Sequence, residues 1–302
     1  MEKIIEWKDK ELIIRDFEKS HANGGRLGKL WAEDLKSGRI FLIKSSSPFS
    51  YEPFSEKMAY IIGRDIGVDV LEYDIMPADE LRDIMYIHPL CKYVSVCEKI
   101  DRKGYVISSV AEIKRARNAL VNDDSKKVKN KEVMYEILSK QYIDTMLLFD
   151  AIIGNEDRHY GNVHVLRTMN GEIVGAPILD NGASLLALRP IWEILFWNNK
   201  VGEKCNKAFT IADNHDKQLE TVTEVNNISF NITTKTMQIL KDLEPTLNLM
   251  PKTRATLIKK FIVYRLHKYL GMMKYSDNIE YFKSKQSRSN RQLKEQEESC
   301  KK

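Results

Sequence analysis

Three polar residues in the middle of the chain have the types and the spacing that phosphoryl transfer requires. Asp157 and Asn162 stand five residues apart in a polar segment, and Asp180 follows a predicted hairpin. A carboxylate can accept the proton of an attacking hydroxyl, while an amide oxygen and a second carboxylate can hold Mg²⁺ against phosphates. An Asp followed five residues later by an Asn arises by chance about once in a chain of 302 residues. The prediction therefore depends on the combination with the surrounding elements.

A glycine-rich segment and a lysine near the N-terminus would complete a nucleotide site. Gly24, Gly25 and Gly28 lie between predicted strands, where bare backbone amides can approach phosphates closely. The segment matches neither G-x-G-x-x-G nor the P-loop pattern, so a plain hairpin turn is the alternative. Lys44 ends the apolar strand 40–44, the place from which a kinase lysine holds the α and β phosphates.

A predicted helix follows Lys44 and offers two partners for its ammonium. Apolar residues recur at helical spacing over 54–66, and Gly67 stands where a C-cap is expected. Glu56 and Glu52 both lie near the start of this helix, where a carboxylate also interacts favourably with the helix dipole. We favour Glu56 as the partner of Lys44 and keep Glu52 as the alternative.

The first part of the chain is rich in predicted strands. Its short apolar runs are broken by Gly, Ser and Asn, as in sheets with tight turns. The predicted strands are 11–17, 29–35, 40–44, 68–75, 81–87 and 93–97. Residues 98–101 would then connect this part to the rest of the chain.

The second part is mainly helical. An apolar stripe from Met134 to Ile153 predicts one long helix that ends at Gly154. Residues 163–166 and 178–179 predict a hairpin that carries Asp180 at its end. A further helix is predicted between the proline and the glycine at positions 251 and 271.

This layout predicts an α+β protein with two lobes. A small β-rich N-lobe would span 1–101, and a larger, mainly helical C-lobe would span 102–282. Residues 283–302 are nearly all polar or charged and would form a tail.

The string Asp157-Arg-His-x-x-Asn162, with Asp180 opening Asp-Asn-Gly, resembles the catalytic loop and metal site of HipA-like kinases. It is also similar to the corresponding string of phosphatidylinositol kinases and their protein-kinase relatives. The length of the chain resembles that of the short, stand-alone bacterial serine/threonine kinases of this family, which include secreted effectors. The resemblance implies a bilobal protein-kinase-like fold and an ATP- and Mg²⁺-dependent serine/threonine protein kinase.

The same resemblance implies roles for individual residues. Asp157 would be the catalytic base, and Asn162 and Asp180 the metal ligands. His159 lies within the motif and would either contact phosphate or support the loop. The backbone at Glu98 and Lys99 would bind the adenine ring.

Two nearby features have two readings each. Arg158 would either pair with a carboxylate or a phosphorylated residue, or be exposed and solvated. The serines at 45–47, directly after the predicted nucleotide lysine, are either an autophosphorylation site or a flexible turn.

Composition excludes several other classes of protein. The chain is 43% hydrophobic and 30% charged, as in an ordinary globular protein, and its net charge of +5 is spread too evenly to favour nucleic acid. It has no run of about 20 apolar residues and no apolar run at its start, so neither a membrane span nor a signal peptide is predicted. The four cysteines lack CxxC spacing and are predicted to be free thiols. We expect a cytoplasmic protein, with export by a route lacking a cleaved signal left open.

Three other functions compete with a protein kinase. A kinase for a lipid or a small molecule shares the motif, although no polybasic or lipid-anchoring helix is predicted. A kinase-fold nucleotide-binding regulator need not keep Lys44, Asp157, Asn162 and Asp180 together. A DNA-binding toxin partner would need a basic helix or a dimer motif, and the sequence shows neither.

Overall fold

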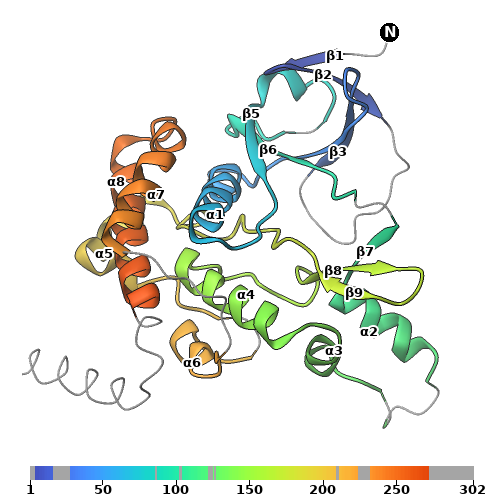
Figure 1. Ribbon diagram of the computed structural model, residues 1–302. Helices are drawn as coiled ribbons and strands as arrows, with labels where there is room; N and C mark the ends of the chain where they lie inside the picture. Colours follow the sequence, from blue (N-terminus) through green and yellow to red (C-terminus); the bar gives the residue numbers. More distant parts are fainter. Residues whose placement is uncertain are drawn as a thin grey trace, which may run out of the picture.

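The fold, shown in Figure 1 as a computed structural model, places a strand-rich lobe against a larger helical one. The structure describes residues 4–15, 28–85, 87–101, 104–121, 125, 127–208, 211–223 and 232–271. The predicted α+β class is confirmed.

The N-terminal lobe is built on a six-stranded antiparallel sheet in the order β1-β2-β3-β4-β6-β5. Its strands are β1 (Ile4–Trp7), β2 (Lys10–Arg15), β3 (Lys29–Asp34), β4 (Ile40–Lys44), β5 (Tyr73–Pro77) and β6 (Tyr93–Glu98). On β4, Phe41 and Ile43 are buried in the core of this lobe. Because side chains alternate along a strand, Leu42 and Lys44 lie on the opposite face of the sheet.

Most of the predicted strands are confirmed. The predicted runs 29–35, 40–44 and 93–97 correspond to β3, β4 and β6, and the described part of 11–17 belongs to β2. The run 68–75 pairs as a strand only from Tyr73, as β5. The prediction omits β1, which pairs along its whole length with β2.

The predicted strand at 81–87 is wrong. A 3-10 helix, η1 (Asp79–Leu81), and turns occupy this part of the chain instead. The guanidinium of Arg82 donates to the carbonyls of Ile87 (3.3 Å) and Cys91 (2.7 Å), which folds the segment back on itself. The apolar residues here are buried by this loop rather than by strand pairing, a distinction that a short apolar run does not reveal.

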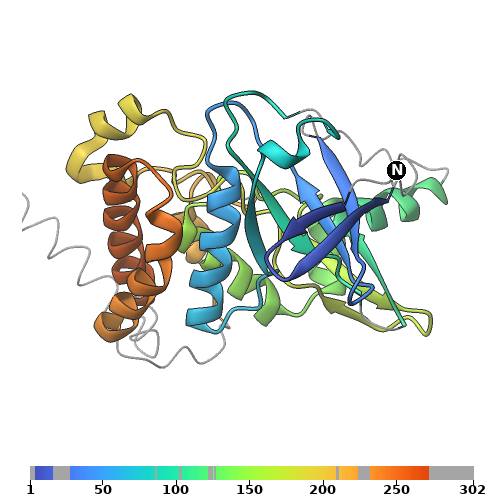
Figure 2. The same ribbon diagram turned by 90° about the horizontal axis from the view of Figure 1, so that it is seen from above.

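Helix α1 (Glu52–Ile66) lies between the two lobes, with the six-stranded sheet on one side and α7 and α8 on the other (Figure 2). It packs against β5, β6 and α7. Its apolar residues Phe54, Met58 and Ile62 are buried in the core that it shares with the helical lobe. Gly67 ends it in the left-handed conformation (φ 78°), as predicted.

The helical lobe contains a second, three-stranded antiparallel sheet in the order β7-β8-β9. Its strands are β7 (Tyr105–Ser109), β8 (His164–Thr168) and β9 (Ile173–Gly175). The α-helices are α2 (Val110–Ala119), α3 (Asn130–Ile137), α4 (Lys140–Ile153), α5 (Ile191–Trp197), α6 (His215–Leu219), α7 (Ile232–Leu247) and α8 (Lys252–Arg265). Helix α8 continues as a π-helical turn, η4 (Leu266–Leu270), so the predicted helix between 251 and 271 is confirmed.

The single long helix predicted over 134–153 is wrong, because the chain forms α3 and α4 with a break between them. Leu138 is extended (φ −113°, ψ 141°). Ser139 caps α4 by accepting a hydrogen bond from the amide of Tyr142 (3.2 Å). The apolar stripe continues across the break, so periodicity alone hides it, whereas a serine at an N-cap is a recognisable signal.

Two hydrophobic cores support the lobes. One lies within the N-terminal sheet, and the larger one runs from α1 through α4 to α8. Because α1 belongs to the larger core, the domain boundary at 101 stays a prediction. The boundary at 282 and the tail lie outside the described residues.

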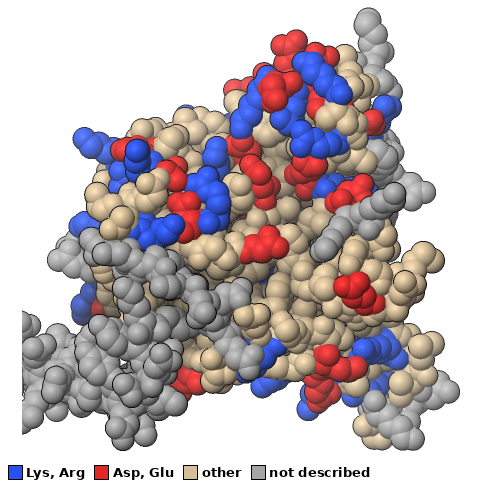
Figure 3. All heavy atoms as spheres, in the orientation of Figure 1, with Lys and Arg blue, Asp and Glu red and all other residues tan. Residues whose placement is uncertain are grey.

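Charged side chains of both signs are interspersed over the described residues of the face shown in Figure 3. This distribution agrees with the even spread of charge in the sequence. Among the described residues, no helix combines the length and the apolar character that crossing a bilayer requires.

Candidate active site

The loop that follows α4 presents Asp157 on the surface. The helix is buried from Ile143 to Ile153 and ends at Gly154, whose φ of 62° suits glycine. Asn155 is fully buried: its side-chain amide donates to Asp150 (3.1 Å) and its Oδ1 accepts from the amide of Asp157 (3.1 Å). The backbone of Asp157 is therefore fixed while its carboxylate is exposed.

Asn162 lies beside Asp157 across the same loop. Its amide nitrogen Nδ2 donates to the carbonyl of Asp157 (3.3 Å), and its backbone amide donates to the carbonyl of His159 (2.8 Å). Since the Nδ2 end is engaged in the loop, the Oδ1 end is the part of this side chain left to face a ligand.

Lys44 is the centre of an ion-pair cluster drawn from β4, α1 and the Asp180 turn. Its ammonium lies 3.1 Å from Oε1 of Glu56 on α1 and 2.6 Å from Oδ1 of Asp180. The side chain of Glu56 is only 2% exposed and that of Asp180 is 37% exposed. The predicted lysine and the predicted metal-binding carboxylate are thus brought together.

The electrostatics of this cluster follow from burial and from the Lys44 charge. Burial lowers the pKa of Lys44, but Tyr73, Glu56 and Asp180 outweigh it and hold the pKa well above its usual value. Burial alone would raise the pKa of Asp180, but the Lys44 ammonium lowers it to about 2. Burial raises the pKa of Glu56, and Lys44 opposes that rise. The exposed carboxylate of the pair is thus kept ionised, as a metal ligand must be.

The choice between Glu56 and Glu52 is settled by geometry in favour of Glu56. Glu52 accepts from the amide of Ser47 (2.9 Å) and from the hydroxyl of Ser50 (2.7 Å) instead. It ties the loop after Lys44 to the start of α1. Sequence alone could not decide, because both residues lie in the first turns of the same helix.

Asp180 does not end the predicted hairpin, and that part of the prediction is wrong. Strand β8 pairs with β9, and residue 178 instead forms a parallel bridge with Val70. Asp180 has a φ of 62°, an uncommon conformation for a residue other than glycine. The amide of Asn181 donates to Glu56 (2.8 Å) and so fixes the Asp-Asn-Gly turn next to Lys44.

Arg158 is the residue whose importance the sequence leaves undecided. Its side chain is fully buried and forms an ion pair with Asp150 (2.9 Å). It also donates to the carbonyl of Asn162 (3.1 Å), to that of Leu179 (2.7 Å) and to Oδ1 of Asn181 (2.7 Å). One guanidinium therefore joins the Asp157 loop to the Asp180 turn. The solvated alternative for Arg158 is wrong.

The remaining predicted site residues are the glycines before β3, His159 in the loop after α4, and the connector at the end of β6. Gly24 and Gly25 lie outside the described residues, whereas the carbonyl of Gly28 accepts from the amide of Ser45 (2.9 Å). His159 is exposed, and its Nδ1 accepts from the amide of Gly161 (3.1 Å), which supports the loop.

The connector is partly engaged in the sheet. Glu98 forms an exposed ion pair with Arg39 (3.0 Å). The amide of Lys99 donates to the carbonyl of Ile40 (2.7 Å). An adenine contact from this segment would therefore have to use backbone groups other than the Lys99 amide. Of the serines after Lys44, Ser45 and Ser46 are buried, which leaves little access for a phosphorylating centre.

The oxygen donors around Asp180 suit Mg²⁺. This ion prefers hard oxygen ligands and is usually held by one or two carboxylates together with phosphate oxygens. Asp180 offers an ionised carboxylate and Asn162 an amide oxygen, on loops that Arg158 holds together. The residues present therefore fit a magnesium ion shared with a polyphosphate.

His215 on α6 gives the fold a pH dependence of its own. Its side chain is fully buried, and burial together with the charge of Arg265 lowers its pKa from 6.5 to about 3, against the opposing charge of Asp216. An unfolded chain takes up a proton here below about pH 6.5, whereas the folded chain does not. Neutral His215 therefore makes its full contribution to the free energy of unfolding above pH 6.5. This contribution declines as the pH falls toward 3.

We expect the wild type to lose about 1.5 kcal/mol more than His215→Leu between pH 6.5 and 5, because only the wild type has this proton to take up. Urea denaturation at both pH values measures the difference. Equal pH slopes for the two proteins would contradict the assignment.

Comparisons with known proteins bear on the fold that carries this site. No protein-family model matches the chain, and no curated protein sequence matches it. Among solved structures it is similar to the Helicobacter pylori proinflammatory kinase CtkA, with a TM-score of 0.61 and 17% identity over 92% of this chain and 100% of that one. It also matches HipA of Shewanella oneidensis, from a complex with HipB and operator DNA, with a TM-score of 0.42 and 15% identity over 85% of this chain and 67% of HipA.

The similarity to CtkA confirms the predicted kinase-like fold.

Proposed function

We propose that this kinase-fold chain is an ATP- and Mg²⁺-dependent serine/threonine protein kinase that transfers the γ-phosphoryl group to a protein hydroxyl. The observation that carries the proposal is the Lys44 cluster. A strand lysine, a helix carboxylate and a loop carboxylate 136 positions away meet within 3.1 Å of one ammonium. Such a cluster is what a kinase needs to hold nucleotide phosphates and their metal.

The proposed roles follow from the placement of each residue. Lys44 neutralises nucleotide phosphates, with Glu56 holding its ammonium in place. Asp180 and Asn162 provide oxygen ligands for Mg²⁺, which neutralises the charge that develops on the transferred group. Asp157 accepts the proton of the attacking hydroxyl as the new O–P bond forms and the bond to the leaving ADP breaks. Its exposure suits a hydroxyl that arrives on another protein.

The decisive experiment is transfer of label from γ-labelled ATP, with Mg²⁺, to a generic acceptor protein. We expect labelled acceptor with the wild type and phosphoserine or phosphothreonine in its digest. Label that appears only in a lipid or small-molecule acceptor would instead identify a lipid or small-molecule kinase. Nucleotide binding without any transfer would identify a kinase-fold regulator.

Asp180→Asn is the matched site variant for this experiment. Asparagine tolerates the positive φ of this position and can still accept from Lys44, so the turn should persist while the metal-binding charge is lost. We expect transfer to fall about 10²-fold or more. Asp79→Asn, at a side chain 84% exposed, removes an equal charge away from the site and should leave transfer unchanged. Unchanged transfer by Asp180→Asn would overturn the metal-site assignment.

A further inference from the structure

Strand β3 presents two side chains on the face of the N-terminal sheet that carries Lys44. Lys29 pairs directly with Lys44 in the β3–β4 register, and Trp31 pairs with Leu42. Residues directly opposite each other in an antiparallel pair project from the same face of the sheet. Lys29 and Trp31 therefore share a face with Lys44.

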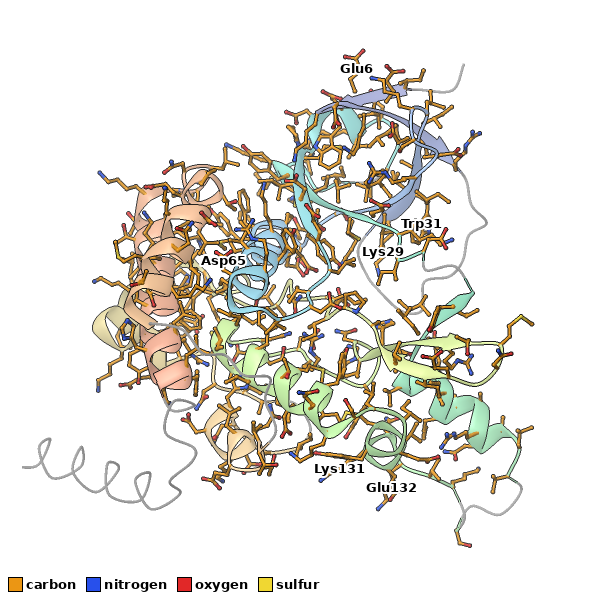
Figure 4. All side chains as sticks on the ribbon, in the orientation of Figure 1. Glu6, Lys29, Trp31, Asp65, Lys131 and Glu132 are labelled. Atoms are coloured by element: carbon orange, nitrogen blue, oxygen red, sulfur yellow. The ribbon has the colours of Figure 1, made fainter. Side chains whose placement is uncertain are left out.

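The other face of β3 is accounted for by packing. Ala32 is buried with Phe41 and Ile43 in the N-terminal core, and Leu30 packs against that core. Lys29 is exposed and Trp31 is half-buried, so neither serves that core. Figure 4 shows both at the part of the sheet that lies nearest the three-stranded sheet of the helical lobe.

The two lysines differ in how their charges are compensated. Lys44 is engaged by Glu56 and Asp180. For Lys29, no carboxylate of the described residues lies within ion-pair distance. An ammonium that no described carboxylate pairs with, opposite Lys44 in the strand register, raises the local attraction for polyanions.

The backbone at Lys29 is fixed. The carbonyl of Gly28 accepts from the amide of Ser45, which locks the ends of β3 and β4 together. A side chain on such a strand end loses little further freedom when it binds a ligand.

We infer that β3 supplies a second phosphate-binding cation, Lys29, and an indole that contacts the nucleoside, Trp31, on the face that carries Lys44. The inference rests on the proposed nucleotide-binding function. Lys29 takes up a polyphosphate oxygen that Lys44, held by two carboxylates, leaves unneutralised. Trp31, two residues further along the strand, offers an aromatic surface on which a base can stack.

Calorimetric titration with Mg-tripolyphosphate, adenosine and Mg-ATP separates the two contacts. We expect Lys29→Gln to weaken tripolyphosphate and ATP binding about tenfold, in line with one charge-assisted contact, and to leave adenosine binding unchanged. Trp31→Leu should weaken adenosine and ATP binding about tenfold and leave tripolyphosphate binding unchanged. Lys29→Arg should restore tripolyphosphate binding, because it restores the charge.

Matched controls come from the same chain. Lys36→Gln removes an exposed lysine from the far end of the same hairpin, and Trp192→Leu removes an exposed indole from α5. Both should bind all three ligands as the wild type does. Trp31→Phe, which keeps an aromatic ring, should retain most of the adenosine affinity that Trp31→Leu loses, and a loss as large in Trp31→Phe would show that stacking is not the cause.

The outcomes distinguish this inference from the proposed function. Wild-type affinities in Lys29→Gln and Trp31→Leu would overturn the inference and leave the kinase proposal standing. A wild type whose ligand binding depends on Lys29 and Trp31, but which transfers no label, would support the inference and overturn the kinase proposal. A wild type that binds none of the three ligands would overturn both.

Discussion

Asp157→Asn should lower the rate of phosphoryl transfer to protein by about 10²- to 10⁴-fold, the usual contribution of a general base. The fold should be retained, because the Asp157 carboxylate is exposed and the loop is held by its backbone amide on Asn155. Single-turnover transfer from γ-labelled ATP measures the rate, and thermal unfolding checks the fold. Affinity for Mg-ATP should stay close to that of the wild type, since Asp157 is assigned to the hydroxyl rather than to the nucleotide.

The neighbouring residue provides the matched control for Asp157. His159 is also exposed and lies in the same loop, and its Nδ1 accepts from a backbone amide of that loop. His159→Gln should therefore retain transfer within about an order of magnitude, as expected for a supporting residue. Wild-type transfer by Asp157→Asn would remove Asp157 from the mechanism, and a far larger loss in His159→Gln would move the catalytic role to the imidazole.

Arg158→Met should lower the free energy of unfolding by about 3–5 kcal/mol, because it leaves the Asp150 carboxylate charged, buried and without its partner. It should also abolish transfer in whatever fraction remains folded, since the guanidinium joins the Asn162 loop to the Asp180 turn. Urea denaturation measures the first effect. Transfer measured well below the unfolding midpoint isolates the second.

A double variant tests the physical reason for this loss. Asp150→Leu combined with Arg158→Met removes both buried charges, so it should recover much of the lost stability but not the lost transfer. Arg64→Met, which breaks the half-exposed ion pair with Asp242, should cost at most about 1 kcal/mol. A loss no greater in Arg158→Met than in Arg64→Met would show that the buried pair is not what holds these loops together.

Much of the fold was predictable because its signals are local. The helix that ends at Gly67 and the strand that ends at Lys44 follow from periodicity and from the residues that end them. The break between α3 and α4 was missed because the apolar stripe crosses it, although Ser139 is a strong capping residue. At 81–87 the apolar pattern predicts a strand that does not form. The apolar residues there pack within a loop that Arg82 holds together.

The sequence is enough to predict which residues form the candidate site. It does not predict which of them contact one another. Residue type and spacing singled out Lys44, Asp157, Asn162 and Asp180. The meeting of Lys44 with Asp180 depends on contacts between elements more than a hundred residues apart, to which no local pattern is sensitive. For Arg158 the sequence permits both a buried and a solvated side chain, and only the packing of α4 against the two loops decides between them.

The position of α1 has a thermodynamic consequence. One end of this helix holds Glu56 against Lys44, while its length packs against α7 and its last turn is tied to that helix by the pair of Arg64 and Asp242. A molecule that binds α7 and shifts α1, and with it Glu56, would change the affinity of the Lys44 cluster for its ligand. By linkage, the ligand changes the affinity of α7 for that molecule by the same factor. Through α1, the surface of α7 and the lysine at the end of β4 would then be thermodynamically linked.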